Sequence, residues 1–149
     1  MRPSSIALAF LALACAGSPA SPDLTFRRIV DGGFSLLNEA GVQIVRDRPT
    51  WDTIAAKLRV DPATGNLNFA SEMALVVLLG ERPTGGYSVR IERIEKRDAT
   101  FEVSAVEERP HASCIVSQVI TSPFAVVAVA KSEGSASVHW TVTTGTPCR

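Results

Sequence analysis

The sequence predicts a mainly β domain, an antiparallel β-sandwich or partly open barrel of about seven or eight short strands with one packed α-helix. Apolar and polar residues alternate in several short runs, and turns rich in Gly and Pro separate these runs. The helical period of 3.6 residues occurs in a single stretch. The 15 basic and 15 acidic residues balance to a net charge of zero, which argues against a nucleic-acid-binding surface.

The predicted strands follow one another along most of the chain. The first two cover residues 23–30 and 41–46. Residues 74–79 are all apolar, so this strand should be covered on both faces, at the centre of a sheet or inside a barrel. Further strands are expected over residues 87–92, 101–105, 115–120, 124–130 and 138–142, with a hairpin turn at 96–98 and a polar break over 107–111.

One helix is predicted over residues 49–58. Apolar side chains recur there at helical spacing on one side: Trp51, Ile54, Ala55 and Leu58. Asp47 or Thr50 can cap the N-terminus of this helix, and Pro49 is tolerated in its first turn. The apolar side should therefore pack against the strands.

The N-terminal residues have the pattern of a secretory signal. Arg2 precedes an uncharged apolar run that is too short to span a bilayer as a helix. Residues 11–15, Leu-Ala-Leu-Ala-Cys, resemble the lipobox of bacterial lipoproteins, in which the cysteine is lipidated. An ordinary small-residue cleavage site, with release as a soluble secreted or periplasmic protein, is the alternative. We expect a signal peptide over residues 1–14, lipidation of Cys15 at the bacterial envelope, a flexible tether over residues 15–22 and a single domain over residues 23–149.

Two further cysteines lie in the expected domain. When Cys15 is assigned to the lipid, Cys114 and Cys148 remain as a pair in an oxidising compartment, which predicts a disulfide. This bridge would tie the last strand to the body of the domain. Two unrelated thiols are the alternative.

Several segments carry a family resemblance. They are Gly-Glu-Arg-Pro-Thr-Gly-Gly-Tyr-Ser-Val at 80–89, Glu-Arg-Pro at 108–110 and Thr-Ser-Pro-Phe-Ala-Val-Val at 121–127. With the Trp-bearing helix and the apolar strand before them, they resemble the C-terminal domain of the protease complex subunit PrcB family over most of residues 42–131. The resemblance implies an exported bacterial protein that accompanies a surface protease as a small accessory subunit. The terminal strand and the pair of cysteines do not come from this resemblance.

The candidate partner-binding loop consists of Arg82, Pro83, Thr84, Gly85, Gly86 and Tyr87. Pro83 fixes one dihedral angle, while the two glycines permit positive φ and close approach by the backbone of another chain, so the tip should be stiff and sterically open. Tyr87 offers the kind of amphipathic contact that is common at binding hot spots. A purely structural turn with Tyr87 packed inward explains the same residues. The loop also has a weaker local likeness to the chagasin-type inhibitors of cysteine proteases, although Arg82 replaces their Asn.

Groups for catalysis or metal binding are not evident. His111 is expected in a loop and His139 on the outward face of a strand, and neither has a cysteine or carboxylate at metal-ligand spacing. No nucleophile elbow, phosphate-binding glycine loop or dinucleotide fingerprint is present. The sequence thus predicts a non-enzymatic protein with no cofactor, which binds a protein partner such as a secreted protease. A direct protease inhibitor that uses loop 82–87 is the alternative.

Overall fold

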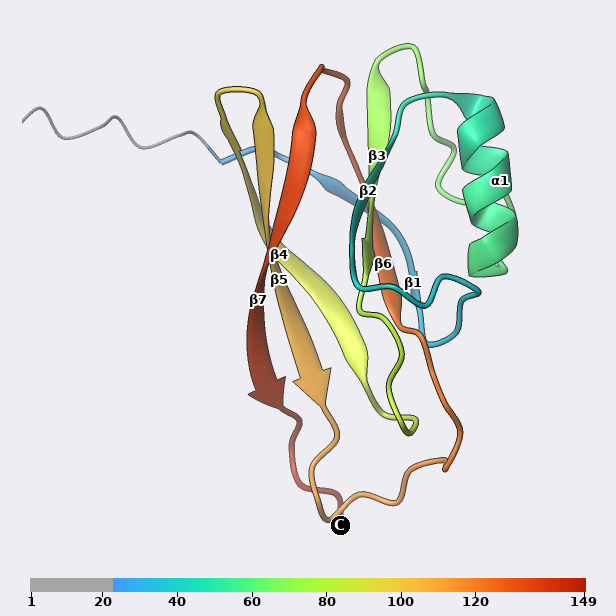
Figure 1. The fold of residues 1–149 in the computed structure, drawn as a ribbon, viewed down its shortest axis with the longest axis vertical. Helices are drawn as coiled ribbons and strands as arrows, with labels where there is room; N and C mark the ends of the chain where they lie inside the picture. The colour runs from blue at the N-terminus through green and yellow to red at the C-terminus, as the bar shows by residue number, and fades with distance from the viewer. Residues whose placement is uncertain (1–22) are drawn as a thin grey trace, which may run out of the picture.

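The computed structural model describes residues 23–149, and the expected signal peptide, Cys15 and tether lie outside these residues. Two β-sheets pack face to face, and a helix covers the outer face of one of them (Figure 1). The elements are β1 (Arg27–Gly32), β2 (Gly41–Val45), α1 (Arg48–Leu58), β3 (Glu72–Leu78), β4 (Ser88–Arg97), β5 (Thr100–Arg109), β6 (Phe124–Ala130) and β7 (Ser135–Thr144). This arrangement confirms a mainly β sandwich with one packed helix, and no closed barrel forms.

The first sheet has four antiparallel strands in the order β1-β6-β3-β2. Its central strand β3 is buried on both faces, as predicted from its uninterrupted apolar run. Met73, Leu75 and Val77 face the second sheet, while Ala74 and Val76 face the layer that contains α1. The alternation of side chains along a strand therefore places β3 between two separate apolar layers.

Helix α1 begins one residue before the predicted helix and ends at the predicted residue. Asp47 is the N-cap, and its carboxylate accepts a hydrogen bond from the Thr50 amide at 2.8 Å. Trp51 is fully buried, and its indole N–H donates to the Pro62 carbonyl at 2.9 Å. Arg59 closes the helix with φ 59° in the left-handed region. The cap and the apolar side together fix α1 on the sheet.

The second sheet has the order β4-β5-β7. β4 and β5 form the predicted hairpin, with Asp98 at φ 51° in the turn. The predicted polar break over 107–111 is wrong for its first residues, because β5 continues to Arg109 and Glu107 is buried. β7 pairs with β5 in parallel. The chain reaches β7 only after crossing to the other sheet as β6, so β5 and β7 run in the same direction.

Two other predicted strands differ from the structure. The first strand begins at Arg27, and Asp23 forms only an isolated bridge with Glu95. Residues 115–120 form no strand, because no neighbouring strand pairs with them and the Ile115 side chain is fully exposed. Within residues 23–149, no helix has the length and apolar character needed to cross a membrane.

Candidate functional site

Two connections lie side by side at one end of the sandwich. Loop 79–87 leads from β3 in the first sheet to β4 in the second, and segment 110–123 leads from β5 back to β6. Both run along the lower end of the domain in Figure 1. Each connection passes between sheets, so neither is a simple hairpin turn. We call the surface that they form the loop end.

Backbone hydrogen bonds join the two connections. Arg82 and Thr121 exchange N–H···O bonds of 2.8 and 2.9 Å, and the Gly85 amide donates to the Ser117 carbonyl at 2.8 Å. The Thr121 hydroxyl donates to the Thr84 carbonyl at 2.8 Å. Loop 79–87 is therefore held in place along much of its length by segment 110–123.

The two glycines of the loop face this segment. A Cβ atom at Gly85 would lie 2.3 Å from the Ser117 hydroxyl oxygen, and one at Gly86 would lie 2.9 Å from both Pro110 and Val116. Gly86 also has φ +84°, a region that other residues rarely adopt. The sequence predicts that these glycines admit the backbone of another chain. In the structure Gly85 is covered by a segment of the same chain, while Pro83 and Gly86 remain exposed.

Beneath the loop, Arg82 makes an ion pair that the sequence does not reveal. Its guanidinium donates to both carboxylate oxygens of Glu107, at 2.8 and 3.2 Å, and Arg109 donates to the same carboxylate at 2.8 Å. The Glu107 side chain is only 6% exposed. Arg82 also lies 6.0 Å from the centre of the Tyr87 ring, and that ring packs partly against the core between the sheets. The side chains of Arg82 and Tyr87 thus attach the loop to β5 and to the core between the sheets.

These contacts have a consequence at acid pH. The hydrogen bonds from Arg82, followed by the one from Arg109, hold the pKa of Glu107 below its usual value of 4.5. Because the unfolded state binds this proton more readily, the stabilisation is present above about pH 4.5 and is lost as the pH falls through the lower pKa of the folded state. We predict that Glu107→Gln will flatten the acid limb of a plot of unfolding free energy against pH, measured by urea denaturation. An unchanged acid limb would contradict this assignment.

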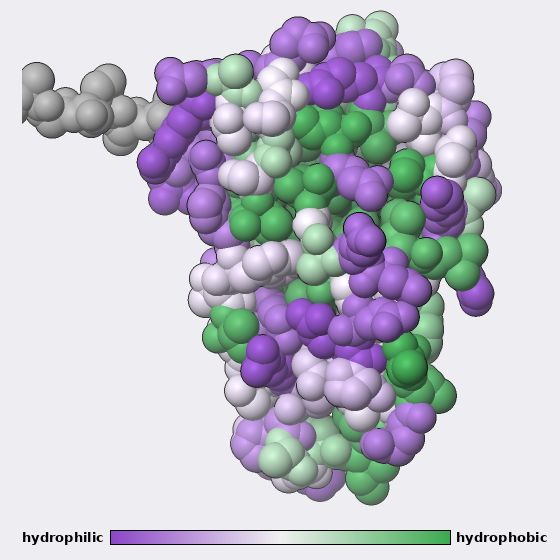
Figure 2. Space-filling model, in the orientation of Figure 1, coloured by the Kyte–Doolittle hydropathy of each residue, from purple (hydrophilic) through white to green (hydrophobic). Residues whose placement is uncertain are grey.

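The outer side of the loop end is apolar and accessible. Ile115 is fully exposed, Ile120 is 65% exposed and Val119 is 48% exposed. Pro83 in the neighbouring connection is also exposed. Figure 2 shows apolar surface at the lower right of the view, where segment 110–123 runs in Figure 1. Adjacent apolar pairs at 115–116 and 119–120, instead of a strict alternation, are the signal that these residues are not in a strand.

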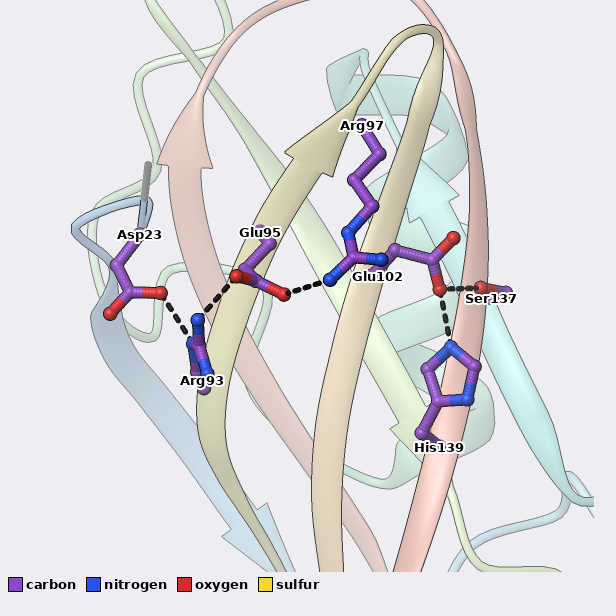
Figure 3. Close-up of polar contacts among 7 residues, drawn as sticks. All are labelled: Asp23, Arg93, Glu95, Arg97, Glu102, Ser137 and His139. Carbon is purple, nitrogen blue, oxygen red and sulfur yellow. Dashed lines mark hydrogen bonds and ion pairs between the residues drawn. The ribbon is translucent and has the colours of Figure 1, made fainter. Parts of the chain in front are cut away.

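A second polar cluster lies on the outer face of the sheet β4-β5-β7 (Figure 3). The Glu102 carboxylate accepts hydrogen bonds from the Ser137 hydroxyl, at 2.7 Å, and from the His139 imidazole. These hydrogen bonds, with that from His139 the larger cause, lower the pKa of Glu102. Ser137 and His139 both bind the carboxylate and the serine does not contact the imidazole, so the geometry differs from that of a serine nucleophile with its base.

The same face carries a row of alternating charges. Arg93 pairs with Asp23 at 2.5 Å and with Glu95, and Arg97 donates to Glu95 at 3.2 Å. Among the described residues, no three His, Cys, Asp or Glu side chains are placed to hold a metal ion. Because the arginines are matched by carboxylates, this face has little excess charge of either sign.

The predicted bond between Cys114 and Cys148 is present, with the two Cα atoms 4.9 Å apart. The Ser113 hydroxyl donates to the Cys148 carbonyl at 3.3 Å and accepts from the Cys148 amide at 3.1 Å. The bridge thus ties the chain beyond β7 to segment 110–123, directly before the exposed Ile115. His111 lies in the same turn and interacts with Ser113.

Comparison with known proteins agrees with the resemblance over part of the chain. Residues 73–130 match a family model described as PrcB C-terminal. The matched segment runs from β3 to β6 and contains both connections of the loop end. Searches of curated proteins and of solved structures gave no match. The part of the chain from residue 73 to residue 130 is therefore similar to the PrcB C-terminal family.

Proposed function

We propose that this protein is a non-enzymatic accessory subunit of a protease complex at the bacterial envelope and that it binds its partner through the loop end. The observation that carries the proposal is the exposed apolar surface of Ile115, Val119 and Ile120, held on a fixed backbone. Exposed apolar clusters of this kind mark protein-binding sites. The match of residues 73–130 to the PrcB C-terminal model supports this class of complex, because the family resemblance implies an accessory subunit of a protease.

The backbone of the loop end is already ordered in the free chain. Hydrogen bonds from Arg82, Gly85 and Thr121 join the two connections, and the disulfide fixes the start of segment 110–123. An ordered surface loses less conformational entropy on binding than a flexible loop does. The site is therefore suited to a stable contact between subunits.

The same hydrogen bonds argue against the inhibitor alternative. An inhibitory loop that enters a protease cleft must project from its scaffold, whereas Gly85 is buried against Ser117. Insertion of loop 82–87 would require the two connections to separate. The exposed parts of the loop, Pro83 and Gly86, are better placed to border the apolar surface of segment 110–123.

The anchoring of the protein is part of the proposal. We infer that residues 1–14 are removed on export and that Cys15 carries a lipid, with residues 15–22 as the tether. Radiolabelled palmitate incorporation that is lost in Cys15→Ser is the expected result. Labelling that persists in this variant, or its absence from the wild type, would contradict the anchor without affecting the binding surface.

The binding surface predicts a specific loss of the partner. In the natural host, affinity-tagged full-length protein should co-purify with a protease identified by mass spectrometry. Ile115→Asp/Ile120→Asp should reduce the recovery about tenfold or more, because charges replace apolar side chains at the centre of the contact. Both positions are exposed, so the variant should melt at nearly the wild-type temperature.

The control is Thr53→Asp on the exposed side of α1, outside the family match. It should retain the partner at the wild-type level. Equal recovery from the Ile115→Asp/Ile120→Asp variant and from the wild type would show that the loop end is not the binding surface. If the recovered protease is inactive in complex with the wild-type subunit and becomes active when the subunit is removed, the protein is an inhibitor.

A further inference from the structure

The outer edge of strand β7 has no hydrogen-bonded partner strand within residues 23–149, although β2 of the other sheet lies close to part of β7. β7 is the last strand of its sheet and pairs only with β5. Figure 1 shows the C-terminal half of β7 at the outside of the domain. An edge of this kind presents a row of backbone N–H and C=O groups that can pair with another strand. Proteins usually protect long edges with charged residues, proline or bulges.

β7 has almost none of these protections. Its sequence, Ser-Ala-Ser-Val-His-Trp-Thr-Val-Thr-Thr, covers ten residues without Lys, Arg, Asp, Glu or Pro. Its register with β5 is continuous from Ser135 to Thr144, without a bulge. His139 is its one ionisable side chain, and that residue is bound to Glu102. β7 is therefore a long, regular and uncharged edge.

The other three edge strands of the two sheets are different. β4 carries six charged residues in its ten, and Leu24 donates to the Ile94 carbonyl along that edge. β1 contains Arg27, Arg28 and Asp31. β2 is uncharged but has only five residues. Among the edges of the described domain, β7 alone combines length with the absence of charge.

The inner side of β7 is only partly covered by its own domain. Ala136, Val138 and Trp140 pack against the core between the sheets and remain partly exposed, while Val142 is 48% exposed. A strand added beside β7 would cover more of Trp140 and Val142 and would extend the apolar layer. The free edge thus offers both backbone groups and apolar surface.

Both ends of β7 are fixed. At the N-terminal end, the Ser135 amide donates to the Ala99 carbonyl at 2.8 Å. At the C-terminal end, the Gly145 amide donates to the Arg109 carbonyl at 2.8 Å, and the disulfide holds Cys148. Pairing with an ordered strand costs less conformational entropy than pairing with a flexible one.

We propose that β7 pairs with β7 of a second copy of this chain, in antiparallel orientation about a two-fold axis. The two three-stranded sheets would then form one continuous six-stranded sheet. A two-fold contact brings the same surface of both copies together, so any charge on the strand would lie close to the same charge on the second copy and would repel it. The uncharged sequence of β7 satisfies this condition, whereas the charged β4 does not.

The proposal lies outside the family-matched segment, which ends at residue 130, and it is independent of the binding surface at the loop end. Full-length wild-type protein in detergent, at increasing concentration, should change from monomer to dimer in sedimentation equilibrium. Over the same range, amides along β7 should become protected from hydrogen exchange, because edge amides exchange rapidly until they are paired.

Thr141→Lys/Thr143→Lys should weaken the dimer about tenfold or more, because lysines would lie close to one another across the axis. Both side chains are exposed, so the fold should be retained. The matched control is Gln43→Lys on the edge strand β2, also exposed, which should dimerise like the wild type.

A wild-type protein that stays monomeric, or a dimer that survives Thr141→Lys/Thr143→Lys, would overturn the proposal. A dimer that is lost in Gln43→Lys and kept in the β7 variant would place the contact on β2. Protection of β7 amides in a monomer, seen only after the co-purified protease is added, would show that an extended partner segment occupies the edge.

Discussion

Replacing Cys114 and Cys148 by serine should lower the free energy of unfolding by about 4 kcal/mol, the largest loss predicted for this domain. The bridge spans 34 residues of sequence, which include all of β6 and β7. In the unfolded chain, closing a loop of this length removes conformational freedom, and the constraint favours the folded state. Without it, the last strand still pairs with β5 and packs its inner side chains against the core, but the chain beyond it is no longer linked covalently to segment 110–123.

Urea denaturation of the oxidised wild type and of the Cys114→Ser/Cys148→Ser variant measures this effect. The wild type unfolded in the presence of a reductant is the control, and it should resemble the variant. A loss below about 1 kcal/mol in both samples would mean that the bridge constrains the unfolded chain far less than its loop length indicates. The same variant should show faster hydrogen exchange in segment 110–123, because the bridge fixes the start of that segment.

Arg82→Ala should cost about 3 kcal/mol of unfolding free energy, because it removes the main partner of a nearly buried carboxylate. Arg82 supplies two of the three arginine hydrogen bonds to Glu107, and only the one from Arg109 remains in the variant. The substitution also removes the cation next to the Tyr87 ring. Loop 79–87 should loosen from the sheet as a result.

Arg82→Lys should fall between Arg82→Ala and the wild type, because lysine keeps the charge but not the paired geometry of the guanidinium. Arg90→Ala is the matched control. Its partners Glu92 and Glu108 are exposed, so it should cost about 0.5 kcal/mol or less. Thermal or urea unfolding that gives equal values for Arg82→Ala and Arg90→Ala would show that burial of Glu107 does not strengthen the pair.

An element could be predicted from the sequence when its signal lies in residues that are close together along the chain. The capped helix and the apolar strand β3 were predictable, because helical spacing at Trp51 and an unbroken apolar run are properties of neighbouring residues. The hairpin between β4 and β5 was predictable for the same reason. The strand expected over 115–120 was not found, because β-forming residues make a strand only where a neighbouring strand supplies hydrogen bonds.

The candidate site was predictable only in part. The Pro and Gly residues of loop 82–87 indicate a tight connection with close backbone contact, and the structure contains one. Which backbone makes that contact depends on segment 110–123, about 30 residues further along the chain, and no spacing rule connects the two. The pairing of Arg82 with Glu107 was missed for the same reason. In the sequence, Glu107 stands among several charged residues next to Arg109 and is indistinguishable from a surface charge.

The sequence by itself determined the β-rich class, the capped helix, the central strand, the pairing of the two cysteines and the similarity of residues 73–130 to the PrcB C-terminal family. Each of these follows from local periodicity, turn chemistry, cysteine number or a motif. Only the tertiary structure decided that loop 79–87 is bound to segment 110–123 and that Ile115 and Ile120 are left exposed. It also decided that β7 pairs in parallel with β5 and forms the edge of its sheet. These features arise because residues far apart in sequence compete for the same hydrogen bonds and apolar surface, and that competition is resolved only when the two sheets pack together.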